Sequence, residues 1–489
     1  MDKTEMNMLI NGKWVGGERD KRLEAESPAT GEIIASLPRG TERDVDRAVR
    51  SARDYQPELS SQTAFYRAEL CHAIAERMKS RKEELARWLS LDQGKPFQAE
   101  AFGEVDQAIS HFTEAAEDAK RLETPVLPSE DPNKRIFTIR EPHGVLGVIT
   151  PWNFPLAIPS EYISAALATG NSIVWKPAST APAIAVKLAE CIHNAFEDQG
   201  LNSGAFNLVP GPGSTIGQAM VTHDKVDAIG LTGSPEVGER VASQSGLKKL
   251  LLELGGNGPV VVLEDADIEK AAQDSAFGSF YCAGQVCVAS ERILVHSSIK
   301  NKFLDLLVEE AKNVKLGPSL DEDTTMGPLN NEEVAQKMDR HIEDAVNKGA
   351  EVIYGGERAA NYPTELYYQP TVLSNVTPDS LLNKEETFGP IAPVIEFETH
   401  DEALEIANGI DLGLVSSVFT TSLDNAIRFA EGIETGAVNI NETSDHWEIH
   451  TPVGGYSGKR SGLGRIGGRW SLQEMTQVKC VNMDIGRDK

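Results

Sequence analysis

The stretch that decides the fold is "GVLGVITPWNFPLAIPSEYISAALATGNSIVWKP", residues 144–177. It begins with a short apolar strand, continues as a helical segment that stops at Gly170, and ends in a second apolar strand. The same alternation continues through the strand-like segments "AFNLVPG", "VDAIGLTG" and "KKLLLELGG". Strands that alternate with helices at this spacing predict right-handed βαβ units and a parallel, doubly wound sheet.

A second alternating series starts near residue 259 and runs from "PVVVLED" to "GAVNIN". The sequence therefore predicts an α/β protein with two doubly wound parallel-sheet domains in tandem. Helical patterns over 43–53, 62–92 and 98–121 precede the first series.

Residues 122–144 interrupt this organisation with four prolines and the strand-like segment "RIFTIR". We interpret them as a small β excursion that meets another subunit. The C-terminal segment "EMTQVKCVNMDIG" is also strand-like, and we expect it to pair with residues 134–142.

The chain has 489 residues and a net charge of −27. Nucleic acids and anionic membrane surfaces attract clustered Lys and Arg, so neither is expected as a partner. The N-terminus has no basic segment followed by an apolar one, and no apolar run reaches the roughly 18 residues that span a bilayer. The five cysteines are scattered and odd in number, which is typical of a reducing compartment. We therefore expect a cytoplasmic protein.

Several turns at predicted strand ends carry unusual residues, and ligands bind at such ends in open parallel sheets. In "TPWNFP" (150–155), Asn153 either caps a rigid loop or donates its amide to an oxyanion. In "PGPGSTIG" (210–217) and "LTGSPEVG" (231–238), glycines near helix starts allow the backbone to approach a pyrophosphate. In "LELGG", Glu253 either lies in solvent or acts as a general base beside the paired glycines.

A further turn, "YCAGQVCVAS" (281–290), contains Cys282 and Cys287. A zinc site needs two more close ligands, which the histidines do not supply, so no metal is predicted. A disulfide is disfavoured in a reducing compartment, which leaves two packed thiols or one nucleophile. The Gly-Gln pair before Cys287 and a helix that we expect to begin there favour the nucleophile, because a helix N-terminus lowers the pKa of a thiol.

Together these segments are similar to the aldehyde dehydrogenase superfamily, and the resemblance covers nearly the whole chain. The shared motifs occur in family order: "PWNFP", "WKPA", "LTGSPEVG", "ELGG", "GQVCVA", "MGPL", "EETFGP", and the "SGLGR" that follows "PVGG". The resemblance implies NAD(P)-dependent oxidation of an aldehyde to a carboxylic acid. It implies a homodimer or homotetramer whose subunit has an NAD(P)-binding domain over 1–124 and 144–252, a catalytic domain over 253–457, and an oligomerisation segment over 125–143 and 470–489.

The resemblance also implies roles for individual residues. Cys287 is the nucleophile that forms a thiohemiacetal and then a thioester, Asn153 stabilises the oxyanion, and Glu253 activates the hydrolytic water. The set expected to bind NADP or NAD is Thr150, Pro151, Trp152, Lys176, Ser179, Gly213, Gly217, Thr232, Gly233, Ser234, Val237, Leu254, Glu386 and Phe388. The side chains expected around the substrate are Phe154, Glu161, Tyr162, Tyr281, Trp447, Ile449 and His450.

Two departures from the family pattern carry information. Ser179 stands where many NAD-preferring members have Glu, so we predict that NADP is accepted, with Lys176 as its counter-charge. Cys282 stands where the family usually has Asn. An oxidative bridge to Cys287 is one hypothesis for its use.

The substrate is the least specified part of the prediction. Members that oxidise succinic semialdehyde typically have an Arg on the helix after "PWNFP", and this helix has none. Aromatic side chains favour an apolar or aromatic aldehyde. An acidic aldehyde is an alternative substrate, because Arg292 and the Lys459-Arg460 pair could supply a positive charge.

Two other functions remain as alternatives. A CoA-acylating relative is disfavoured, because such members commonly lack the glutamate seen here as Glu253. A binding or structural homologue without activity is disfavoured by the joint presence of Cys287, Glu253, Asn153, Lys176 and Glu386.

Overall fold

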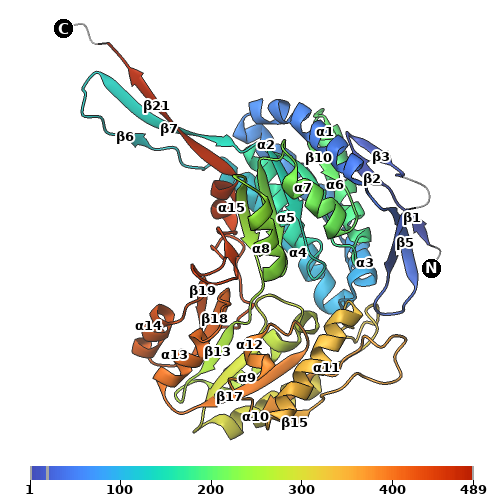
Figure 1. The fold of residues 1–489 in the computed structure, drawn as a ribbon, viewed down its shortest axis with the longest axis vertical. Coiled ribbons are helices and arrows are strands. Elements are labelled where there is room, and N and C mark those ends of the chain that lie inside the picture. The colour runs from blue at the N-terminus through green and yellow to red at the C-terminus, as the bar shows by residue number, and fades with distance from the viewer. Residues whose placement is uncertain (1–2, 18–20, 487–489) are drawn as a thin grey trace.

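The computed structural model describes residues 3–17 and 21–486, and these form two α/β domains and an extended arm (Figure 1). Each domain has a hydrophobic core of its own around its own sheet. The tandem arrangement expected from the sequence is confirmed.

The first sheet has the parallel centre that the sequence predicts, but its edges are antiparallel. Strands β8 to β12 run parallel to one another, whereas β2, β3 and β20 pair antiparallel at the two ends. In spatial order the strands are β20 (Gly462–Leu463), β12 (Lys249–Glu253), β11 (Ala228–Thr232), β8 (Val145–Ile149), β9 (Ser172–Lys176), β10 (Phe206–Leu208), β2 (Met8–Ile10) and β3 (Lys13–Val15).

Helices cover both faces of this sheet (Figure 1). The helical pattern over 62–92 is broken into α2 and α3, because Arg81 leaves helical geometry with φ −116° and ψ 19°. The helices are α1 (Glu42–Ser61), α2 (Ala64–Ser80), α3 (Lys82–Gln93), α4 (Phe102–Ala119), α5 (Ala157–Thr169), α6 (Ala183–Asp198), α7 (Gln218–Thr222) and α8 (Pro235–Gln244).

A small sheet of β1 (Thr4–Glu5), β5 (Ile33–Pro38) and β4 (Arg22–Glu26) lies beside this domain and was not predicted. Its strands are short, and they precede the regular alternation on which the prediction depends.

The second sheet is parallel except for its edge strand β15. Its strands, in spatial order, are β15 (Glu351–Tyr354), β16 (Thr371–Ser374), β17 (Ile391–Phe397), β14 (Arg292–His296), β13 (Pro259–Val262), β18 (Val415–Phe419) and β19 (Ala437–Ile440). Its helices are α9 (Ile268–Phe280), α10 (Lys300–Asn313), α11 (Glu332–Asn347), α12 (Leu381–Lys384), α13 (His400–Asn408) and α14 (Leu423–Gly432).

The arm is an antiparallel sheet that projects from the body (Figure 1). It consists of β6 (Val126–Leu127), β7 (Lys134–Pro142) and β21 (Thr476–Asp484). The predicted pairing of 134–142 with the C-terminal strand is confirmed, with Thr476 opposite Pro142 and Asp484 opposite Lys134.

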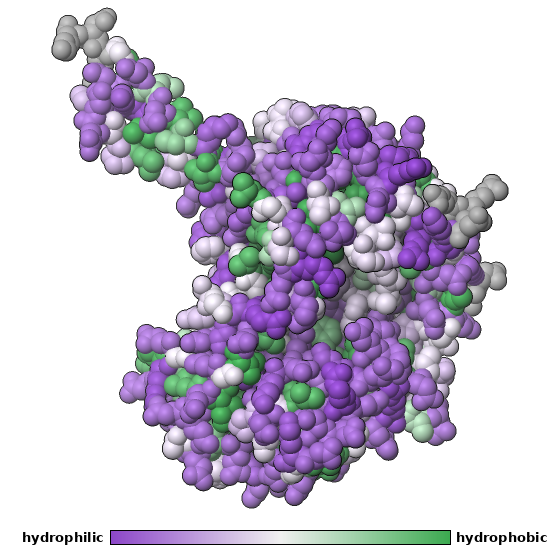
Figure 2. Space-filling model, viewed as in Figure 1, coloured by the Kyte–Doolittle hydropathy of each residue, from purple (hydrophilic) through white to green (hydrophobic). Residues whose placement is uncertain are grey.

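Apolar side chains are exposed along the arm, and Figure 2 shows them as a green patch there. They include Val126, Leu127, Val478 and Met483. An exposed apolar strand is suited to contact with another chain. A role of the arm in oligomerisation therefore stays a prediction.

The boundary proposed at residue 470 needs a correction. Helix α15 (Gly468–Glu474) packs against α4 and α5, so the arm's C-terminal strand starts only at Thr476. Within the described residues, no helix is long and apolar enough to cross a membrane.

Candidate active site between the two domains

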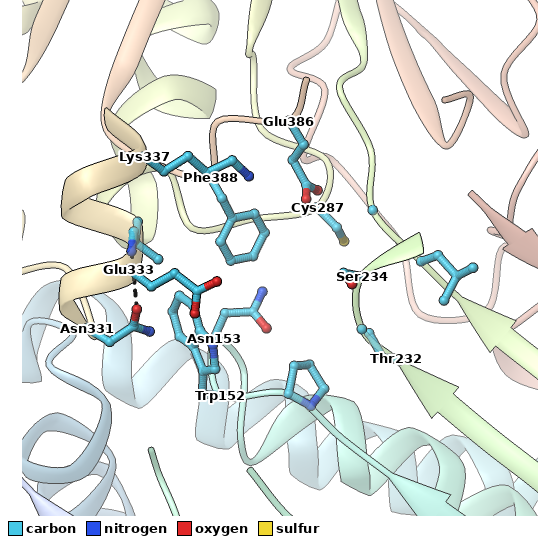
Figure 3. A pocket seen from close by; sticks show the side chains of 15 residues that line it. Trp152, Asn153, Thr232, Ser234, Cys287, Asn331, Glu333, Lys337, Glu386 and Phe388 are labelled. Atoms are coloured by element: carbon cyan, nitrogen blue, oxygen red, sulfur yellow. Dashed lines mark hydrogen bonds between the residues drawn. The ribbon is translucent and has the colours of Figure 1, made fainter. Parts of the chain in front are cut away.

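Two cavities meet at one cysteine. A cleft of about 230 Å³ lies where the carboxyl ends of β8, β11 and β12 face the second domain (Figure 3). A larger cavity of about 680 Å³ opens on the other side. Cys287 and Thr232 line both. We call the first the cofactor cleft and the second the substrate cavity.

The backbone around Cys287 differs from the prediction. Helix α9 ends at Phe280, and the next residues turn through left-handed geometry, with φ 52° at Cys282, 52° at Ala283 and 69° at Gly284. Cys287 lies in the turn that follows, so the expectation that a helix begins there is wrong. Tyr281 ends the helix with ψ 135°, and the left-handed residues after it keep the chain from resuming a right-handed helix.

The thiol of Cys287 therefore lacks the helix end that was expected to acidify it. Burial raises its pKa to about 12, and the nearby carboxyls of Glu386 and Glu253 act in the same direction. In Figure 3 its side chain lies between Glu386 and Ser234.

Asn153 lies in the turn after β8, and its side chain is fixed by the cysteine turn. Its Nδ2 donates to the carbonyl of Gln285 at 2.9 Å. The Gln285 side chain in turn donates to the Cys282 carbonyl at 2.8 Å and accepts from the Asn330 backbone N–H at 2.8 Å. One N–H of the Asn153 amide is thus used to hold the turn, and the other is left for a ligand at the cleft that Asn153 lines.

Glu253 ends β12 and faces the substrate cavity. It is 4 % exposed, and none of the described residues forms a hydrogen bond with its Oε1. Burial raises its pKa well above the ordinary value, and Glu161 raises it further. A carboxyl held in this way takes up a proton readily, as a general base must.

The paired glycines after Glu253 lie against the Cys287 backbone and the Glu386 side chain. A Cβ on Gly256 would lie 2.0 Å from the Cys287 carbonyl oxygen, and one on Gly255 would lie 2.9 Å from Glu386 Oε2. The Gly256 N–H donates to Glu386 Oε1 at 2.9 Å. Only glycine fits at position 256, because a Cβ there would meet a backbone oxygen, and the close fit keeps Glu386 and Cys287 near the same turn.

Eight of the fourteen residues expected to bind the cofactor line the cofactor cleft, as does Asn153. Trp152 and Phe388 meet edge to face there, with ring centroids 5.5 Å apart. The predicted lining residues are Pro151, Trp152, Asn153, Thr232, Gly233, Ser234, Leu254, Glu386 and Phe388.

Helix α11 and its N-cap Asn331 supply lining residues that the sequence did not indicate: Asn331, Glu333, Val334 and Lys337. They follow the "MGPL" motif, whose position could have indicated them. Lys337 is near enough to lower the pKa of Glu386, although burial dominates and raises that pKa to about 7.

Six other predicted cofactor residues do not line the cleft: Thr150, Lys176, Ser179, Gly213, Gly217 and Val237. Thr150 is buried and accepts from the Trp175 indole at 2.9 Å. Ser179 Oγ donates to the Gly211 carbonyl at 3.1 Å, which ties the segment after β9 to the turn after β10. Lys176 is buried, and burial lowers its pKa to about 8. Thr150, Lys176 and Ser179 lie at or just after the ends of β8 and β9, Gly213 and Gly217 bound a short helical turn after β10, and Val237 lies in the first turn of α8.

The substrate cavity contains Phe154, Glu161, Tyr281 and Trp447 as expected. Tyr162, Ile449 and His450 do not line it. The Tyr162 hydroxyl is held in the core, 3.1 Å from the Leu231 carbonyl and 3.0 Å from Thr232 Oγ1. Ile449 lines a smaller cavity nearby, and His450 points outward and is largely exposed. Residues that sequence reasoning missed include Gln107, His111, Phe277, Asn439, His446 and Thr451.

The described lining of this cavity contains no Lys or Arg. The Arg292 guanidinium is buried and donates to the carbonyls of Asn257, Ile406 and Ala407 at 2.7 to 3.0 Å. Lys459 donates to backbone carbonyls, and Arg460 pairs with acidic residues on α8. The three cations that made an acidic aldehyde an alternative substrate thus lie outside the cavity.

Cys282 lines neither cavity. Its sulfur lies 3.7 Å from Gln93 Nε2 and 3.7 Å from the Asn153 carbonyl, and its N–H donates to Glu100 at 3.0 Å. Burial raises its pKa to about 12. Packing accounts for these contacts, and the bridge to Cys287 stays an untested hypothesis.

Fold and site together define a two-domain α/β protein with a cysteine, a glutamate and an asparagine where two cavities join. Residues 14–481 match the model of the Aldehyde dehydrogenase family. The chain belongs to this family.

Its relatives act on several aldehydes. It is 39% identical to the lactaldehyde dehydrogenase of Methanocaldococcus jannaschii, over 97% of this chain and 99% of that one. It is 38% identical to the mitochondrial succinate-semialdehyde dehydrogenase of Oryza sativa, over 97% of this chain and 89% of that one. Among solved structures, an NADP-dependent enzyme of E. coli superposes with a TM-score of 0.95, 34% identity and coverage of 98% of both chains.

Proposed function

We propose that the protein oxidises an aldehyde to a carboxylic acid through a covalent intermediate on Cys287, with NADP or NAD as oxidant. The observation that carries the proposal is that Cys287 lines both cavities. A nucleophile in that position reaches an aldehyde on one side while the product of its attack faces a hydride acceptor on the other.

Each proposed step has a group in place. The Cys287 sulfur attacks the aldehyde carbonyl, and the Asn153 amide and the Cys287 N–H stabilise the oxyanion. When bound, the cofactor supplies the oxidised nicotinamide ring that accepts hydride. Cys287 then carries a thioester, and Glu253 takes a proton from the water that hydrolyses it.

The lining of the cofactor cleft fits a dinucleotide. Gly233 and Gly255 leave room in the cleft, the Trp152 and Phe388 rings suit a planar ring, and the Glu386 carboxylate suits sugar hydroxyls. We propose a cofactor domain over 1–124 and 144–252 and a catalytic domain over 253–457. Both would contribute to the site: Asn153 comes from the first, and Glu253, Cys287 and Glu386 come from the second.

For the adenosine end, we infer that NADP is accepted. Ser179 carries no charge that would repel a 2′-phosphate, and Lys176 ends β9, three residues before Ser179. Two related structures support both cofactors as candidates: the NADP-dependent enzyme of E. coli, and a betaine aldehyde dehydrogenase of Staphylococcus aureus in complex with NAD+.

For the substrate, we infer an apolar or aromatic aldehyde. Phe154, Phe277, Tyr281 and Trp447 wall the cavity, and its described lining contains no cation to pair with an acidic substrate. An acidic semialdehyde is the second candidate, because succinate-semialdehyde dehydrogenases are among the relatives. Glu253 disfavours CoA as acyl acceptor, since a base is needed for water.

A substrate panel tests the proposal. The purified protein is assayed with aliphatic, aromatic and acidic aldehydes, each with NAD and NADP, by the absorbance of the reduced cofactor. We expect the highest kcat/KM with aromatic or longer aliphatic aldehydes, and a free acid as product with or without CoA. Acyl-CoA as the main product would refute the role of Glu253, and a kcat/KM with NADP far below that with NAD would refute the inference from Ser179.

A further inference from the structure

We propose that Glu161 is a proton-relay residue that carries the proton taken by Glu253 out of the substrate cavity. This inference rests on the proposed function, in which Glu253 activates the hydrolytic water. A base that acts in every turnover must release its proton again. Glu253 is buried and its Oε1 has no hydrogen-bond partner among the described residues, so the proton needs a second carrier.

Glu161 is the candidate that the shared cavity and its effect on Glu253 favour. It lies on the first half of α5, is 5 % exposed, and lines the substrate cavity together with Glu253. Of the charged groups that act on Glu253, Glu161 has the largest effect on its pKa. Two buried carboxyls that line one cavity hold a proton between them more easily than they hold two negative charges.

On its other side, Glu161 lines a second, small cavity of about 10 Å³, which has the size of a single water site. Glu161 and His111 line both this cavity and the substrate cavity. The small cavity is also lined by Ser164, Ser471 and the half-buried Glu114 of α4. Polar groups thus continue from Glu253 through Glu161 to a carboxyl that reaches the surface.

The other titratable groups around this path do not replace Glu161. On α4, burial lowers the pKa of His111 to about 3, so its ring stays neutral near pH 7. Arg465, which lowers the pKa of Glu253, donates to the carbonyls of Gly455 and Gly464.

Asp445, His446 and Glu448 line the substrate cavity from the segment 437–453, and none of them lines the small cavity. Two more groups lie nearby: Tyr162 on α5 and Glu474 on α15. Burial raises the pKa of Tyr162 well above its ordinary value, and Glu474 pairs with Lys249. Burial raises the pKa of Glu161 itself to about 8, which suits a group that takes and releases a proton near neutral pH.

The relay conserves protons and electrons. Glu253 takes a proton from the attacking water and passes it through cavity water to Glu161. Glu161 passes it through water in the small cavity to Glu114 and then to solvent. Each carboxyl returns to its starting state, and the oxidation of the aldehyde is complete before the relay acts.

The test is Glu161→Gln in the full-length protein. Gln keeps an oxygen that can accept from the Gly467 N–H and the Ser471 hydroxyl, but it cannot carry a proton. We expect kcat to fall about 10- to 100-fold, with the aldehyde KM within twofold. The first turnover should stay fast, seen as a burst of reduced cofactor, because only hydrolysis of the thioester is slowed. Added formate or acetate should restore part of kcat.

Glu117→Gln, on the exposed side of the same helix as Glu114, is the matched control and should leave kcat unchanged. An unchanged kcat in Glu161→Gln, or a lowered kcat that small acids do not restore, would overturn the relay.

If Glu161→Gln does not fold, the wild-type protein supplies a second test. Its kcat in mixtures of H2O and D2O should curve with the deuterium fraction if several protons move in the relay, and a straight line would overturn it. A wild-type protein that oxidises no aldehyde would instead refute the proposed function, so the two failures are distinguishable.

Discussion

The cofactor cleft and the substrate cavity share Cys287 and Thr232, yet they are built from different kinds of sequence. The cleft consists largely of short contiguous motifs at the ends of β8, β11 and β12 and in the loop at 386–388. The cavity is assembled from single side chains on α4, α5 and α9 and in the segment 437–453.

The difference has a physical cause. In the turns that carry the cleft residues, backbones approach so closely that only glycine fits at some positions. A Cβ on Gly284 would lie 2.0 Å from the Gly389 carbonyl oxygen, and one on Gly256 equally close to that of Cys287. The cavity needs only apolar volume with a few polar groups, and many side chains provide that. Motifs therefore indicate the chemistry, whereas the shape of the cavity decides the substrate.

The largest expected effect is at the residue that both regions share. Cys287→Ala removes the nucleophile, so aldehyde oxidation should fall by about 10⁴-fold or more. Binding of NADP, followed by quenching of tryptophan fluorescence with Trp152 in the cleft, should persist. Activity that survives this change would place the nucleophile elsewhere and separate the two cavities functionally.

The second largest effect is expected at Glu253, which lines the substrate cavity. Glu253→Gln keeps the size of the side chain but removes the base, so kcat should fall about 10²- to 10⁴-fold. One equivalent of reduced cofactor per active site should still form rapidly, because the hydride step does not need the base. Rapid-mixing absorbance measures both phases. The loss of that first turnover would contradict the assignment of Glu253 to hydrolysis.

Much of the fold and part of the site could be predicted from the sequence alone. The alternation after residue 144 predicts both sheets and the pairing of the arm, because hydrophobic periodicity reports which face of each element is buried. The motifs also indicate Glu253, Asn153 and Glu386 at one site.

What the sequence did not predict depends on tertiary packing. The left-handed turn at Cys282 replaces the expected helix start, and Tyr162 points into the core because its hydroxyl finds partners on β11. Glu161 gains its place at the junction of two cavities only when α15 packs on α5. No local pattern reports such contacts.

A smaller effect tests the corrected environment of the nucleophile. Because the pKa of the Cys287 thiol is raised to about 12 by burial and neighbouring carboxyls, only a small thiolate fraction exists at pH 7. Without cofactor, its alkylation by iodoacetamide should accelerate about tenfold per pH unit from pH 7 to 9, without levelling off. Peptide mass spectrometry separates Cys287 from the exposed Cys480. A plateau near pH 7 would restore the acidified thiol that the sequence suggested.

The smallest effect concerns the wall of the substrate cavity. Trp447 lines it, whereas His450, three residues further on, lies outside and is largely exposed. Trp447→Ala removes apolar contact with a ring-bearing substrate, so the KM for benzaldehyde should rise about tenfold, with that for acetaldehyde changing less than twofold. His450→Ala is the matched control and should leave both KM values within twofold. Equal shifts in the two variants would mean that the cavity extends beyond its described lining and that side chains near Trp447 do not define an aromatic site.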